Sequence, residues 1–156
     1  MHYNYKKTKK KVWELLNKDD FDKVAEKISR FHISKVIGPL IFFLYSSDKT
    51  IKQRAITVIG IVVSRLADHD IKSACAIMRR IMWGVNDKSG SISWVAPEVI
   101  PEIMARNKKL ANEYHKILIS YTIPNTNDLE HENLQKGVYQ SMKKFALKKP
   151  ELVKQM

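Results

Sequence analysis

The chain has 156 residues, enough for one domain that buries roughly two thirds of the surface its unfolded chain exposes. Its single cysteine, Cys75, excludes an intramolecular disulfide, and the apolar helical stretch around it predicts a buried, unreactive thiol. The net charge is +12, but residues 1–11 hold five lysines without an acid and residues 133–156 hold six lysines against one glutamate, so the body of the chain is nearly neutral.

The most apolar stretches of the chain are residues 36–45 and 55–63. Polar residues separate them, and each is much shorter than the roughly 20 residues that cross a bilayer. The basic N-terminal sequence is not followed by an apolar run, so it does not resemble a secretory signal. We therefore predict a cytoplasmic protein without a transmembrane segment.

Apolar residues recur at intervals of three and four along almost the whole chain, which predicts helices and no strands. Pro97 suits a first helical turn. Side chains that can accept hydrogen bonds from the first helical amides precede six of the periodic runs: Asp20, Ser34, Asp48, Asp70, Ser93 and Asn107. The predicted helices, in chain order, are 8–17, 20–31, 34–46, 49–67, 71–85, 94–106, 108–122 and 131–148.

The predicted helix 49–67 carries apolar residues on two of its sides. One side holds Ile51, Ala55, Val58, Val62 and Leu66, and the second holds Ile56, Ile59 and Val63. Such a helix has to be covered on both flanks.

The sequence from 36 to 66 has the pattern of a helical repeat. An apolar run over 36–44 is followed by a turn ending in Asp48 and by the stretch 51–61, in which small residues such as Ala55 and Gly60 permit close helix packing. This segment resembles the HEAT repeat, particularly the variant named after phycobilisome lyases.

The same phase recurs at Asp70 and at Asp87, which lies 39 residues after Asp48, near the spacing of HEAT or armadillo units. Residues 78–103 are also similar to functionally uncharacterised prokaryotic HEAT-like proteins, a resemblance that implies no known activity. The resemblance implies an all-α, right-handed α-solenoid of about eight helices in three to four repeats. We expect one such domain over 1–156, with basic ends at 1–11 and 149–156.

Solenoids of this kind bind partners through the surface of their inner helices. On the predicted inner helix 71–85, four residues lie on or beside the side opposite the apolar stripe of Ile71, Cys75, Met78 and Met82: Lys72, Arg79, Arg80 and Trp83. The next inner helix extends this candidate surface with Lys108, Lys109, His115 and Lys116. The alternative interpretation is a solvated face, with Trp83 packed between repeats.

The segment 86–94 is longer than the tight turn that the repeat requires, and it lies between Trp83 and Trp94. Loops held by a rigid scaffold often carry function, so this segment is a second candidate for partner binding, through Asn86, Asp87, Ser89 and Trp94. In the alternative interpretation, Asp87 and Ser93 cap helices and both tryptophans pack beneath the loop.

Motifs of catalysis are missing from the sequence, which has no Walker loop, dinucleotide glycine fingerprint, nucleophile elbow or paired-cysteine zinc site. Asp87, Glu98, Glu102 and His115 could meet only through folding. We therefore predict no enzymatic activity, no cofactor and no metal.

Nucleic-acid binding is the alternative function, and a HEAT-like protein with this function could act in DNA repair. Its candidate residues are Lys7, Lys10, Lys11, Arg79, Arg80, Lys143 and Lys144. Only six of the 28 cations are arginine, which argues against reading of base sequence. The favoured prediction is a non-enzymatic interaction or scaffold module that binds a protein or peptide on its inner helices, with self-association as a further option.

Overall fold

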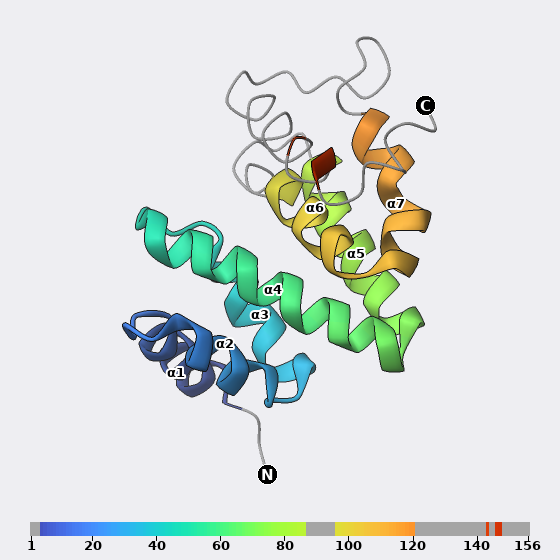
Figure 1. Ribbon diagram of the computed structural model, residues 1–156. Helices are drawn as coiled ribbons and strands as arrows, with labels where there is room; N and C mark the ends of the chain where they lie inside the picture. The colour runs from blue at the N-terminus through green and yellow to red at the C-terminus, as the bar shows by residue number, and fades with distance from the viewer. Residues whose placement is uncertain (1–3, 87–95, 121–142, 144–145, 148–156) are drawn as a thin grey trace. The chain divides into compact units, whose positions relative to one another are not determined.

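In the computed structural model, residues 4–86, 96–120, 143 and 146–147 are described (Figure 1). Within these ranges the chain forms seven helices and no strand, which confirms the prediction of an all-α protein. The helices are α1 (Tyr5–Leu16), α2 (Phe21–Ser29), α3 (Ile33–Phe43), α4 (Lys49–His69), α5 (Ile71–Asn86), α6 (Ala96–Arg106) and α7 (Lys108–Ser120). The chain divides into two compact units, Met1–Val63 and Ser64–Met156.

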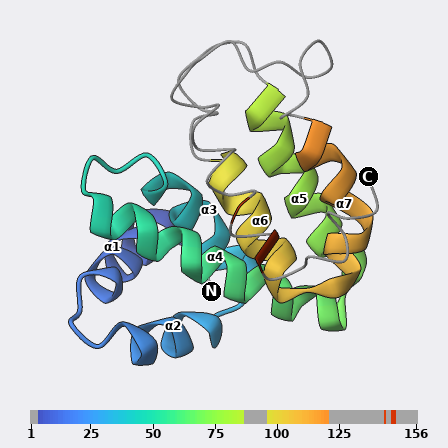
Figure 2. The same cartoon turned by 45° about the horizontal axis from the view of Figure 1, so that its top comes forward.

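In the first unit, α1 packs against both α2 and α3, and α1 and α3 lie side by side in Figures 1 and 2. The apolar residues of α1 recur at positions 12, 15 and 16, so they form a single stripe that is buried, while the lysines occupy the remaining sides. The stripe meets a core to which α2 and α3 contribute Val24, Ile28, Val36, Ile37 and Leu40.

The arginine Arg54 of α4 connects this helix to the end of α1. Its Nη1 donates hydrogen bonds to the carbonyl oxygens of Leu16 and Lys18, each at 2.7 Å. The Leu16 carbonyl belongs to the last turn of α1 and the Lys18 carbonyl follows the helix, so neither accepts a hydrogen bond from an amide of α1, and the guanidinium satisfies both. The same guanidinium lies over the ring of Phe21, at 5.2 Å from its centroid.

The two apolar sides predicted for the long helix α4 are both buried. Ile51, Ala55, Val58 and Val62 on one side are at most 6% exposed, and so are Ile56, Ile59 and Val63 on the second. Leu66 is only half-buried, close to the end of the helix. The coverage on both flanks that the sequence predicted is therefore confirmed.

In the second unit, α6 packs against α5 and α7. The middle helix contributes two adjacent pairs to the core, Val99 with Ile100 and Ile103 with Met104, all at most 1% exposed. The flanking helices contribute Ala74, Met78, Ile81, Leu110, Ala111 and Tyr114. α6 begins at Ala96, so Pro97 occupies the first turn as predicted.

Capping residues were predicted correctly at most of the described helix starts. Backbone amides of the first turn donate to the side chains of Asp20, Asp48, Asp70 and Asn107. The prediction of Ser34 as a cap is wrong, because His32 caps α3 by accepting from the Ser34 amide through Nδ1. The first helix starts earlier than predicted, with Asn4 as its cap.

The predicted caps and helices in the later part of the chain are only partly described. Ser93 lies outside the described residues, as does most of the predicted helix 131–148, in which 143, 146 and 147 are helical. Of the helices that are described, none is long and apolar enough to cross a membrane.

Candidate partner-binding surface

Six described cations of α5 and α7 are exposed in the second unit. Apart from Lys108 at the start of α7, they define what we call the α5–α7 basic surface: Lys72, Arg79, Arg80, Lys109 and Lys116. The helical period explains this exposure. On α5 the buried residues recur at 74, 75, 78 and 81, so the arginines at 79 and 80 fall on the other sides. On α7 the buried residues 110, 111, 114 and 115 leave 109 and 116 exposed.

One side-chain contact between α5 and α7 is present in the second unit. The thiol of Cys75 lies 3.8 Å from Glu113 Oε2 and donates a weak hydrogen bond to it. Cys75 is 8% exposed, which confirms the predicted burial of the only cysteine. The two helices that carry the exposed cations therefore approach each other at Cys75 and Glu113.

The pKa of the Tyr114 phenol on α7 is affected by residues of both helices. Burial raises the pKa of the Tyr114 phenol, which is only 5% exposed, and its interactions with Cys75 and Glu113 raise it further. The positive charge of Arg79 opposes the rise.

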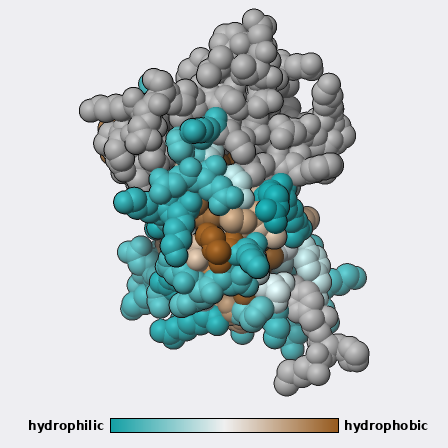
Figure 3. All heavy atoms as spheres, turned by 90° about the vertical axis from the view of Figure 1, so that its right-hand side faces the viewer, coloured by the Kyte–Doolittle hydropathy of each residue, from teal (hydrophilic) through white to brown (hydrophobic). Residues whose placement is uncertain are grey.

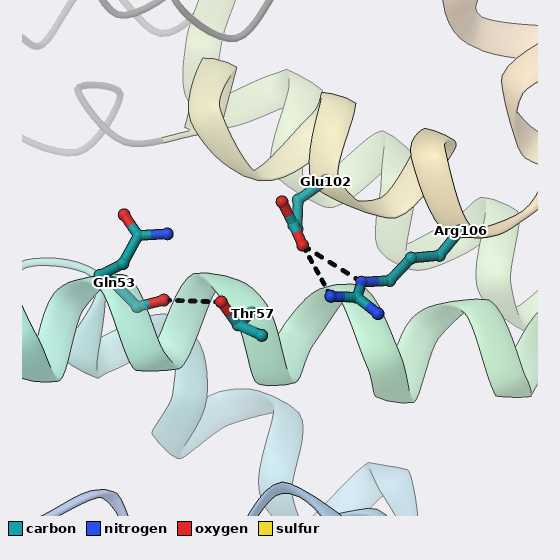
Figure 4. A network of polar contacts seen from close by, with 4 residues as sticks. All are labelled: Gln53, Thr57, Glu102 and Arg106. Carbon is teal, nitrogen blue, oxygen red and sulfur yellow. Dashed lines mark hydrogen bonds and ion pairs between the residues drawn. The ribbon is translucent and has the colours of Figure 1, made fainter. Parts of the chain in front are cut away.

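An ion pair on α6 of the second unit does not involve the cations of the α5–α7 basic surface. On α6, Glu102 accepts two hydrogen bonds from its neighbour Arg106, at 2.9 and 3.1 Å (Figure 4). By contrast, Arg79, Arg80, Lys109 and Lys116 form no ion pair with another residue that the structure describes. Glu113 is the acid on their side, so the surface retains an excess of positive charge.

Figure 3 shows one face of the protein coloured by the hydropathy of each residue. On the face drawn there, the described residues are mainly hydrophilic and surround a smaller hydrophobic area.

The prediction that His115 extends the candidate surface is wrong. The imidazole is 5% exposed, and its Nδ1 donates to the carbonyl oxygen of Ala111 at 2.8 Å. This bond to the preceding helical turn satisfies one ring nitrogen, so the ring can be buried. Lys108, by contrast, is exposed as predicted.

Several predicted site residues are not described in full. Trp83 and Asn86 belong to α5, but their side chains are outside the described part of the structure. Asp87, Ser89 and Trp94 lie outside the described residues altogether. Partner binding by the segment 86–94 therefore stays a prediction.

The lysines predicted for nucleic-acid binding are exposed where they are described. Lys7, Lys10 and Lys11 project from α1, and Lys143 is exposed in a helical segment, whereas Lys144 lies outside the described residues. Sequence reasoning missed the exposed aromatic residues among the α1 lysines, namely Tyr5, Trp13 and Phe42. A signal was present in the spacing of Tyr5 and Lys9, four residues apart, but the predicted start of this helix at 8 concealed it.

The structure describes three of the four residues considered for catalysis, namely Glu98, Glu102 and His115. Glu102 is bound to Arg106, and His115 is bound to its own helix. Asp87 lies outside the described residues. Over the described ranges, no group of three or more His, Cys, Asp or Glu side chains is arranged to hold a metal ion.

Comparison of the chain with protein-family models, curated proteins and solved structures gave no match. The resemblance to HEAT repeats stays a prediction from the sequence.

Proposed function

We propose that the protein is a non-enzymatic interaction module that binds an acidic segment of another protein or peptide on the α5–α7 basic surface. The observation that carries this proposal is the exposure of cations that form no ion pair with another described residue, on two helices that contact each other through Cys75 and Glu113. The cations project from helical backbone, which does not have to become ordered when a partner binds.

The chemistry of the cations favours carboxylate partners. Arg79 and Arg80 present planar guanidinium groups that can form two parallel hydrogen bonds to one carboxylate, whereas Lys109 and Lys116 act as point charges. A partner with acidic residues spaced along one helix or strand would complement this arrangement. Aspartate- or glutamate-rich segments are the class of ligand we expect.

The HEAT-like solenoid suggested by the sequence is part of the same proposal. In such an array α5 and α7 would be inner helices of successive repeats, and α6 would be the outer helix between them. The packing of α6 against both neighbours supports this order. We place the module in the cytoplasm, where the protein would act as a scaffold.

The test compares affinity capture by the native chain with capture by the double charge reversal Arg79→Glu/Arg80→Glu. Both side chains are exposed, so the variant should fold, which circular dichroism verifies. We expect the recovery of specific partners to fall at least about tenfold, because two favourable charge contacts become repulsive. A synthetic peptide covering the acidic segment of a captured partner should then bind the native chain with salt-sensitive affinity.

The matched control carries the same change of charge elsewhere, in Lys27→Glu/Lys49→Glu on α2 and α4. It should recover the partners as the native chain does. Equal recovery by the Arg79→Glu/Arg80→Glu variant, or partners whose cross-linked segments lack acidic residues, would refute the proposal.

A further inference from the structure

Three large aromatic side chains are exposed on α1 and α3 of the first unit. Tyr5 is 40% exposed, Trp13 is 49% exposed and Phe42 is 50% exposed. Aromatic residues of this size are usually buried, since each removes a large apolar area from water. Three such residues on two neighbouring helices therefore indicate a surface with a binding role.

The side chain of Lys9 joins two of these aromatic residues. Its ammonium group lies 4.2 Å from the centroid of the Phe42 ring and 5.9 Å from that of Tyr5. Tyr5 itself lies against α3, where its ring passes close to Gly38. The three residues consequently form one cluster of alternating charge and aromatic surface across the contact between α1 and α3.

The exposed face of α1 continues this cluster. Lys6, Lys10 and Trp13 follow each other at four and three residues, so they lie along one side of the helix, and all three are exposed. Trp13 is also four residues after Lys9, which places it next to the cluster. We call the combined area the α1–α3 patch; it consists of Tyr5, Lys6, Lys9, Lys10, Trp13 and Phe42.

We propose that the α1–α3 patch binds single-stranded nucleic acid, a function separate from the proposed binding of an acidic protein segment in the second unit. Lysine ammonium groups would contact successive phosphates, and unpaired bases would stack on the exposed aromatic side chains. α1 carries five lysines against one glutamate, so its charge complements a phosphate backbone.

The composition of the patch favours this ligand over the other anionic ones. A duplex keeps its bases stacked inside, so it would leave the exposed aromatic residues unused. A helix that lies in a membrane surface inserts its apolar face, but on α1 that face is buried in the protein core. An acidic protein would be recognised better by arginine, and α1 has none.

The test measures fluorescence anisotropy of labelled 12-nucleotide dT and U oligomers with the full chain at several salt concentrations. With about three phosphate contacts, the logarithmic salt slope should be about −2, and affinity should fall about 20-fold between 50 and 200 mM salt. Binding to a duplex of equal length should be at least tenfold weaker. No binding at 50 mM salt would overturn the proposal.

Two variants separate the charge contribution from the stacking contribution. Lys6→Glu/Lys10→Glu should reduce both the affinity and the salt slope, whereas Trp13→Leu should reduce the affinity about tenfold and leave the slope unchanged. All three side chains are exposed, so folding should be retained, which circular dichroism verifies.

The control Lys27→Glu/Lys49→Glu changes the net charge equally and should retain most of the affinity. A loss in this control as large as in Lys6→Glu/Lys10→Glu would show that only the net charge matters, and would overturn the assignment of the patch. An unchanged affinity in Trp13→Leu would also overturn the assignment of the patch. Tighter binding to vesicles containing anionic lipid than to the oligomers would overturn it as well.

Discussion

The side chain of Asn107 forms hydrogen bonds to residues of α4 and α7 in the second unit, and the variant Asn107→Ala tests how much these bonds stabilise the protein. Its Oδ1 accepts a hydrogen bond from the Leu110 amide and so caps α7. Its Nδ2 donates to the carbonyl oxygen of Ser64 and to Asp68 Oδ1, each at 3.2 Å. Asn107 is only 6% exposed, so water cannot easily replace these bonds.

The expected loss follows from these three hydrogen bonds. Removal of a helix N-cap costs about 1 kcal/mol, and each of the two further bonds adds about 1 kcal/mol. The free energy of unfolding should therefore fall by about 3 kcal/mol, and the melting temperature by on the order of 10 °C.

Urea unfolding followed by circular dichroism measures this change. Asn112→Ala is the control, because it removes an exposed asparagine from the same helix and should alter the stability by less than about 0.5 kcal/mol. Asn107→Asp keeps an acceptor for the cap but loses the amide donors and places a carboxylate beside Asp68, so it should also be less stable than the native chain at pH 7. A loss below about 1 kcal/mol in Asn107→Ala would refute the reasoning.

Three further predictions concern single side chains. Arg54→Met should lower the free energy of unfolding by about 2 kcal/mol in urea titrations, because the guanidinium donates to two carbonyl oxygens at the end of α1. Hydrogen bonds from Ser73 lower the pKa of Asp70. The Asp70 carboxylate should therefore stabilise the protein above about pH 4, and this contribution should be lost as the pH falls through the pKa of Asp70 in the folded protein. The difference in the free energy of unfolding between the native chain and Asp70→Ala should shrink over the same pH range. Cys75 should react with a thiol reagent at least about tenfold more slowly in the native chain than in denaturant, and equal rates would contradict its burial.

The helices and most of their starts could be predicted because the signals are local. Asp20, Asp48, Asp70 and Asn107 each cap the helix that follows, within three residues of the amide that they bind. The cap of α3 was missed because a histidine ring replaces the usual hydroxyl, amide or carboxylate acceptor.

Exposure could be predicted on helices with a clear apolar stripe and not on the others. The stripe of α5 correctly predicts that Arg79 and Arg80 are exposed. His115 lies at the edge of the apolar side of α7, and its burial depends on the hydrogen bond to Ala111, which the spacing of residues does not reveal.

The α1–α3 patch could not be predicted from the sequence, because it depends on a contact between distant residues. Phe42 follows Lys9 by more than 30 positions, and only the packing of α1 against α3 brings the ring beneath the ammonium group. Sequence patterns describe one helix at a time, so they identified the lysines of α1 without the aromatic residues that accompany them.

The two proposed binding surfaces can be tested against each other, because they belong to different compact units. If each is a separate site, Arg79→Glu/Arg80→Glu should lose the acidic partner and retain the salt slope for single-stranded oligomers, and Lys6→Glu/Lys10→Glu should do the reverse. General attraction by a chain of net charge +12 predicts instead that the two variants weaken both interactions alike, since each removes the same charge. Measuring both variants in both assays therefore distinguishes specific surfaces from the overall charge, and parallel losses would refute both assignments.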